Sequence, residues 1–197
     1  MIPAIVLAAG KSSRMGRLKP LLPLPEGDTF LARIVQTLRA ADVEDVVVVV
    51  GHDAALVERA FESQPLAARF VRNDEYEAGQ LSSLEAGLRV IDRPGVVAAL
   101  VTPVDVPLFS VATVRALLQR YRRAPVPVVR PAAGGRHGHP VLIDRCLFAE
   151  LIGADPALGA RAVIRAHASS GADVEVDDPG AFLDIDTPEE YERLLSS

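Results

Sequence analysis

Hydrophobic residues along the chain form short continuous runs that alternate with helically spaced stripes. Most of the runs are rich in β-branched residues and bounded by turn residues, a pattern typical of buried strands. The strands predicted in this way are Ile2–Leu7, Val46–Val50, Arg69–Arg72, Val96–Val101, Pro127–Val129, His139–Ile143 and Val174–Val176.

The stripes between these runs predict helices, and several begin at residues that commonly cap a helix. Helices are expected over 30–38, from an N-cap at Asp53, over Gln80–Ile91 and after an N-cap at Ser110. The last is predicted to start at Thr187, where Thr-Pro-Glu-Glu combines a capping box with proline in the first helical position.

Repeated strand–helix–strand units predict a single-domain α/β fold with a doubly wound, mostly parallel, Rossmann-like sheet. No linker or repeat divides residues 1–197. Residues 1–110 and residues 111–197 are expected to form two halves with different roles. Ligands bind such sheets beyond the carboxyl ends of the strands. Chemistry is therefore expected in the loops after Leu7, Val101 and Leu183.

Composition narrows the class of partners. The net charge of −5 argues against a nucleic-acid groove, which needs a broad basic surface. No apolar run approaches the ~20 residues of a membrane helix. The single cysteine, Cys146, has no partner for an internal disulfide, so a cytoplasmic protein is expected.

The loop after the first predicted strand carries four cations between positions 11 and 19 and no acid. Small residues there let backbone N–H groups approach phosphate oxygens, and the cations supply counter-charge. Lys11 and Lys19 are the only lysines among 21 basic residues, so the compact ammonium groups are confined to this loop. A solvated basic turn is the alternative. A Walker A P-loop is excluded, because the glycine it needs is replaced by Ile5.

Two acidic positions are candidates for binding Mg²⁺, which prefers one or two carboxylates together with phosphate and water oxygens. Asp105 lies between Pro103 and Pro107, which stiffen its loop. Asp184 and Asp186 point to one side if the segment is extended. The alternatives are an ordinary turn aspartate for Asp105 and helix capping near Thr187 for Asp186.

The segment from Leu7 to Pro23 resembles the signature LAAGxSxRMGxxKxLLP of the molybdenum-cofactor nucleotidyltransferases, within the wider nucleoside-triphosphate transferase family. Ala8-Ala9-Gly10 resembles the cytidylyl branch, since the guanylyl relatives have AGG there. Five shorter segments resemble further elements of the family. Pro103–Pro107 resembles its DxP turn, Asp184–Glu189 its DIDTPE signature and Gly79–Leu84 its GQxxSL motif. Gly134–Val141 resembles its GxxGHPVLF element and Asp155–Arg161 its GDxGAR element. The last departs from the pattern at Ala154 and in its spacing, which leaves the acceptor pocket less defined.

The resemblance implies catalytic roles for Lys19 and Arg14, Asp105 and Asp186 as direct Mg²⁺ ligands, and Asp184 in or next to the coordination sphere. The nucleotide-binding residues it implies are Leu7, Ala8, Ala9, Gly10, Ser12, Ser13, Arg14, Met15, Gly16, Lys19, Gln80, Ser82, Ser83 and Asp105. The candidate acceptor-binding residues are Arg136, His137, His139 and Arg161. The alternative for the two histidines is a metal site, and the alternative for the two arginines is an ordinary surface position.

By this resemblance the chain is expected to transfer CMP from CTP to molybdopterin, releasing pyrophosphate, with a molybdenum enzyme as a recipient of the product. Two alternatives remain: the same chemistry with GTP or with a sugar or alditol phosphate acceptor, and a non-catalytic cofactor carrier or insertion partner. The carrier would be expected to lack Lys19 or Asp105, and both are present.

Overall fold

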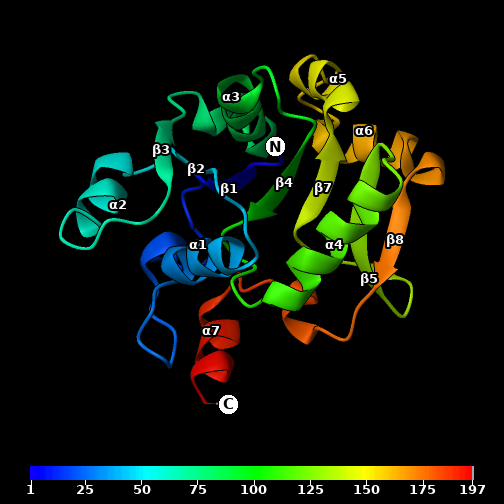
Figure 1. Ribbon diagram of the computed structural model, residues 1–197. Coiled ribbons are helices and arrows are strands. Elements are labelled where there is room, and N and C mark those ends of the chain that lie inside the picture. The colour runs from blue at the N-terminus through cyan, green and yellow to red at the C-terminus, as the bar shows by residue number, and fades with distance from the viewer. Residues whose placement is uncertain (197) are drawn as a thin grey trace.

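The computed structural model describes residues 1–196 and contains one eight-stranded sheet with helices on both faces (Figure 1). The strand order is β3-β2-β1-β4-β7-β5-β6, with β8 paired to β5. The strands are β1 (Ala4–Ala8), β2 (Val46–Val50), β3 (Arg69–Arg72), β4 (Ala98–Pro103), β5 (Val128–Ala133), β6 (Arg136–His137), β7 (Val141–Asp144) and β8 (Ala172–Glu175). The α-helices are α1 (Phe30–Ala40), α2 (Ala54–Ala60), α3 (Gln80–Ile91), α4 (Val111–Arg123), α5 (Phe148–Ile152), α6 (Gly159–Ala166) and α7 (Pro188–Leu195). The short 3-10 helices are η1 (Lys19–Leu21), η2 (Tyr76–Ala78), η3 (Arg145–Leu147), η4 (Ala168–Ser170) and η5 (Pro179–Phe182).

The sheet is parallel in the half that contains β1. Strand β1 pairs in parallel with both β2 and β4, β2 pairs in parallel with β3, and β5 does so with β8. Strand β7 runs antiparallel to β4 and β5, and β6 pairs antiparallel with β5. The reversal follows from the connection between β5 and β6, because Gly134 and Gly135 take positive φ values in a tight turn. A turn this short can join only antiparallel strands. The predicted mostly parallel sheet is confirmed, with an antiparallel insertion.

Two hydrophobic cores lie on the two faces of the sheet. Because successive side chains of a strand point to opposite faces, Ala4, Val6 and Ala8 pack in one core, and Ile5 and Leu7 pack in the other. The first core contains residues of α1, α4 and α7, and the second contains residues of α3, α5 and α6. In Figure 1, α3 and α5 lie on one side of the sheet, whereas α1 and α7 lie on the other. The doubly wound arrangement is therefore confirmed.

Helices begin after all three predicted capping residues, and in two of the three the side chain caps the helix. The Ser110 side chain accepts a hydrogen bond from the Thr113 amide, and Thr187 forms a complete capping box with Glu190. Asp53 precedes α2 as predicted, but its side chain caps nothing. Its backbone is left-handed, with φ of 50°, whereas a capping residue needs an extended backbone.

Three elements in the second half of the chain differ from prediction. Leu183 follows the 3-10 helix η5 and does not end a strand, so the Asp184–Asp186 segment reaches the site from a different element than expected. Helices α5 and α6 were not predicted, because each is too short for a sustained hydrophobic period. Within residues 1–196, no helix combines the length and hydropathy needed to cross a membrane.

Candidate nucleotide-binding site

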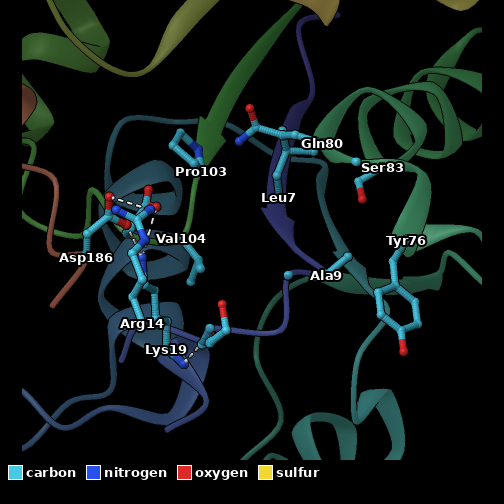
Figure 2. A pocket seen from close by; sticks show the side chains of 15 residues that line it. Leu7, Ala9, Arg14, Lys19, Tyr76, Gln80, Ser83, Pro103, Val104 and Asp186 are labelled. Atoms are coloured by element: carbon cyan, nitrogen blue, oxygen red, sulfur yellow. Dashed lines mark hydrogen bonds and ion pairs between the residues drawn. The ribbon is translucent and has the colours of Figure 1, made fainter. Parts of the chain in front are cut away.

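The Lys19 ammonium group lies between the carboxylates of Asp105 and Asp186. Figure 2 shows Lys19 and Arg14 beside Asp186. Its Nζ is 3.2 Å from Oδ2 of Asp105 and donates a short hydrogen bond to Oδ1 of Asp186. The Arg14 guanidinium contacts the other oxygen of Asp186 at 2.9 Å. Only 9% of the Lys19 side chain is exposed, compared with 69% for Arg14. Three remote parts of the chain therefore meet at one buried cation.

The lysine is held by the turn that precedes it. Ser12 adopts a left-handed backbone, and its carbonyl accepts hydrogen bonds from the Met15 and Gly16 amides at 3.0 Å. The Ser12 hydroxyl accepts a further hydrogen bond from the Lys19 amide. The Met15 side chain is buried in the core and anchors the turn. The loop is thus folded back on itself, so that Lys19 faces the carboxylates.

The two carboxylates are joined through the backbone. The Ile185 amide donates to the Asp105 carbonyl at 2.8 Å, and the Ile185 side chain is fully buried. The Glu190 carboxylate accepts from the amides of Asp186 and Thr187, which fixes the start of α7. Asp105 and Asp186 are consequently held beside each other although no strand pairing connects them.

Glycines let η5 pass close to its neighbours. A Cβ added at Gly180 would lie 2.1 Å from the Leu108 carbonyl oxygen. A Cβ added at Gly138 would lie 2.2 Å from the carbonyl oxygen of Ala181. Both contacts are with backbone, which cannot move aside as a side chain can. The segment that leads to Asp184 and Asp186 therefore depends on two bare backbone positions.

The electrostatics of the three aspartates differ. Hydrogen bonding to Lys19, together with the charges of Lys19 and Arg14, holds the pKa of Asp186 below its usual value. Burial, followed by the nearby Asp105 carboxylate, raises the pKa of Asp184. Three carboxylates thus share a region with two cations, an arrangement that favours a further positive charge.

The carboxylates suit a metal ion whose coordination sphere is completed by oxygens of the substrate. Among residues 1–196, no group of three or more His, Cys, Asp or Glu side chains is arranged to hold a metal ion alone. Mg²⁺ rarely needs such a cage, because one or two carboxylates with phosphate and water oxygens suffice. Asp105 and Asp186 already share one cation, the Lys19 ammonium, and are therefore placed to share another.

A pocket of about 280 Å³ opens beside this cluster. Of the residues predicted to bind a nucleotide, those that line it are Leu7, Ala9, Gly10, Ser12, Ser13, Arg14, Lys19, Gln80, Ser83 and Asp105. The pocket thus joins the glycine loop, the start of α3 and the carboxylate cluster.

Four predicted residues lie outside the pocket lining. Ala8 and Met15 are buried in the core on the far face of the sheet. Gly16 uses its amide within the turn. The Ser82 hydroxyl donates to the carbonyls of Glu75 and Gly79. These contacts direct their side chains or amides away from the pocket.

One pocket residue, Tyr76, was missed by sequence reasoning. It belongs to η2, in the loop that follows β3. Since ligands bind beyond the carboxyl ends of parallel strands, including the loop after β3 among the candidate loops would have found it.

A second cavity of about 410 Å³ adjoins the first and shares Leu7, Arg14, Asp105 and Asp186 with it. It also contains Asp184 and two of the predicted acceptor-binding residues, His139 and Arg161. Burial lowers the pKa of His139, and its Nδ1 atom is buried with no hydrogen-bond partner in the described part of the chain. The lowered pKa favours the neutral imidazole.

The other two predicted acceptor residues lie elsewhere. The hairpin carries Arg136 and His137 to the edge strand β6, outside both cavities. The Arg136 guanidinium is 5.5 Å from the centre of the Phe182 ring. Nε2 of His137 is 3.0 Å from Asp173 on β8. The geometry gives these two residues contacts within the fold in place of contacts with the cavity.

Comparison with known sequences places the geometry in context. Residues 4–171 match the family described as MobA-like NTP transferase domain. A probable molybdenum cofactor guanylyltransferase of Rhodopirellula baltica is 33% identical over 64% of this chain, which spans 58% of that relative's length. Nicotine blue oxidoreductase of Paenarthrobacter nicotinovorans is 30% identical over 98% of this chain and 96% of its own.

Solved structures agree over the whole chain. A nucleotidyl transferase from Methanothermobacter thermautotroptrophicus has a TM-score of 0.82 at 28% identity, covering 100% of this chain and 96% of that one. Rv0371c from Mycobacterium tuberculosis H37Rv has a TM-score of 0.83 at 26% identity, covering 100% and 99%. Its complex with manganese gives a TM-score of 0.78, covering 100% and 98%.

Proposed function

Because the chain belongs to the MobA-like NTP transferase domain family, we propose that it transfers a nucleoside monophosphate from a nucleoside triphosphate to an acceptor phosphate and releases pyrophosphate. The observation that carries the proposal is the Lys19 ammonium, shared by Asp105 and Asp186 at the wall of a pocket that includes the glycine loop. This arrangement combines the groups that bind a polyphosphate with those that bind its metal ion.

In the proposed complex the triphosphate lies along the loop from Gly10 to Lys19, with the base toward Gln80 and Ser83. The Arg14 side chain is exposed and the Lys19 side chain is buried, so the two cations would meet the phosphates from opposite sides of the solvent boundary. In this proposal residues 1–110 form mainly the nucleotide-binding half, and residues 111–197 form mainly the acceptor-binding half. Asp186 is an exception, since it lines the nucleotide pocket from the second half, whereas Asp184 lines the second cavity.

We assign the divalent ion to Asp105 and Asp186, with Asp184 beside them. Support comes from the shared-cation geometry and from the manganese complex of the structural relative. Bound Mg²⁺ would neutralise phosphate charge and polarise the reacting phosphoryl group. Lys19, held beside the same two carboxylates, would donate to phosphate oxygens.

In the reaction an oxygen of the acceptor phosphate attacks the α-phosphorus in line, a new P–O bond forms, and the bond to pyrophosphate breaks. Lys19 and Arg14 stabilise the negative charge on the oxygens in the transition state. A phosphate monoester has its second pKa near 6, so the attacking oxygen is already ionised at neutral pH. No side chain is needed as a general base. Arg161 and His139 are placed to hold the acceptor in the second cavity.

For the substrates we propose CTP and a molybdopterin-type acceptor. The Ala8-Ala9-Gly10 sequence and the Gln80–Leu84 segment support cytosine. GTP is the alternative, in line with the name of the Rhodopirellula relative.

Pyrophosphate release tests these assignments. It should be measured with each of the four ribonucleoside triphosphates, with and without molybdopterin and Mg²⁺. Release that depends on CTP, molybdopterin and metal together supports the full proposal. Release with GTP alone would correct the base. Release only with a sugar or alditol phosphate would correct the acceptor, and no release with any combination would favour a non-catalytic carrier.

A further inference from the structure

Tyr76 forms the end of the nucleotide pocket that lies away from the carboxylates. Figure 2 shows Tyr76 and Ser83 on the opposite side of the pocket from Asp186 and Arg14, with Ala9 between them. The pocket therefore has a charged end, suited to phosphates, and an end that carries an aromatic ring.

The Tyr76 ring is fixed by its surroundings. A Cβ added at Gly51 would lie 2.6 Å from Tyr76 Cβ and 2.9 Å from Ala9 Cβ, so the bare backbone there lets the tyrosine pack close to β1. The His52 ring lies 5.9 Å away between centroids, and the Lys11 ammonium lies 6.0 Å from the ring centre. The tyrosine is thus held in place by the free protein.

Polar groups accompany the ring. Ser83 lines the same end of the pocket, and its hydroxyl is oriented by a hydrogen bond from Asn73 Nδ2 at 3.0 Å. Gln80 lines the pocket between this end and the carboxylates, with its amide directed toward Pro103 (Figure 2). A flat aromatic face beside hydrogen-bonding side chains is the combination that binds a nucleobase, by stacking on its face and by reading its edge.

We propose that Tyr76 is a binding residue on which the base of the nucleoside triphosphate stacks. The inference rests on the proposed function, because it takes the charged end of the pocket to hold the phosphates. Every base has a π face, so stacking tolerates any base. Tyr76 accordingly supports CTP and GTP alike, and the choice between them falls to Gln80 and Ser83.

A ligand without a base separates this role from a merely structural one. Binding of CTP, GTP and inorganic tripolyphosphate should be titrated on wild type, Tyr76→Leu and Tyr76→Phe. Tyr76→Leu is expected to weaken both nucleotides roughly tenfold or more, as loss of one base–aromatic stack implies, and to leave tripolyphosphate unchanged. Tyr76→Phe keeps the ring and should bind like wild type. Equal weakening of all three ligands, or of none, would overturn the inference.

A second variant covers the case in which Tyr76→Leu does not fold. The chain has no tryptophan, so Tyr76→Trp places a single tryptophan at the proposed stacking position, and its fluorescence can be excited selectively. Its emission should change on addition of CTP and stay constant with tripolyphosphate. The same response to both ligands would count against stacking. If wild type binds neither kind of ligand, the proposed function fails and this inference fails with it.

Discussion

Nζ of Lys19 lies 3.2 Å from Oδ2 of Asp105, although 86 positions separate the two residues. The contact has a simple origin in the sheet. Strands β1 and β4 are parallel neighbours, so the loops that follow them leave the same edge. One loop carries a cation and the other a carboxylate, and the fold brings them together.

Replacing Lys19 with alanine should reduce turnover by roughly 10²–10³-fold, comparable to the loss of one donor to a developing oxyanion. Pyrophosphate release under saturating substrate measures the effect. Arg89→Ala provides the control, because Arg89 pairs with Glu85 on the outside of α3 and lines neither cavity. Such pairs contribute only about 0–1 kcal/mol. Near-normal turnover of folded Lys19→Ala would remove Lys19 from the mechanism.

Asp186→Asn should raise the concentration of Mg²⁺ or Mn²⁺ needed for half-maximal activity by roughly tenfold or more, since even residues that only support a metal ligand have effects of that size. A metal titration of activity at fixed nucleotide concentration measures the shift. Asp173→Asn is the control. Asp173 lies on β8, pairs with Arg130 and His137, and lines neither cavity. An unchanged metal requirement in Asp186→Asn would show that this carboxylate does not bind the ion.

Gly138→Ala and Gly180→Ala should each lower the free energy of unfolding by about 1–3 kcal/mol, as expected when added atoms force a packed backbone apart. Urea denaturation measures the loss. Gly153→Ala is the matched control, because its added Cβ would meet nothing closer than 3.5 Å. If the two variants match the control in their free energy of unfolding, the close packing around η5 does not contribute to stability.

The capping box of α7 should make a pH-dependent contribution to stability. Hydrogen bonds from the amides of Asp186 and Thr187 lower the pKa of Glu190 below its ordinary value of 4.5. A carboxylate with a lowered folded-state pKa stabilises the fold above the unfolded-state pKa, and the effect fades as the pH falls through the folded-state pKa. The difference in unfolding free energy between wild type and Glu190→Ala should therefore be largest at neutral pH and shrink below pH 4.5.

Glu190→Gln separates charge from hydrogen bonding in that experiment, since the amide oxygen accepts the same bonds but does not titrate in this range. Its stability relative to Glu190→Ala should not shrink in acid. A constant difference between wild type and Glu190→Ala at all pH values would contradict the assigned role of the carboxylate.

The sequence predicted the fold best where a single signal was strong. Strand β2 has the predicted bounds, because a run of five valines buried on both faces has no competing interpretation. Helix α3 also begins and ends as predicted. Helix α5 has five residues and offers no repeat of its hydrophobic pattern, so local sequence could not reveal it. The antiparallel hairpin depends on the turn at Gly134 and Gly135, which was interpreted as a loop and not as a reversal of strand direction.

The candidate site followed the same logic. Lys19, Asp105 and Asp186 meet as expected, but for two different reasons. Lys19 and Asp105 follow parallel neighbouring strands, whereas Asp186 joins them from the segment after η5, which no strand end predicts. Arg136, His137 and His139 were assigned to the acceptor side through their resemblance to one family element, but strand pairing carries Arg136 and His137 to the sheet edge. Nearness along the chain says little about side-chain direction once a hairpin intervenes.

The Ile185–Asp105 hydrogen bond ties the spacing of two carboxylates to the docking of one segment. Asp105 follows β4, which lies inside the sheet, whereas Asp186 adjoins Ile185 in the segment between η5 and α7. Any displacement of that segment would move Asp186 away from both Asp105 and Lys19. The distance between the carboxylates is therefore set by how η5 and α7 rest against the sheet, and not by the sheet alone.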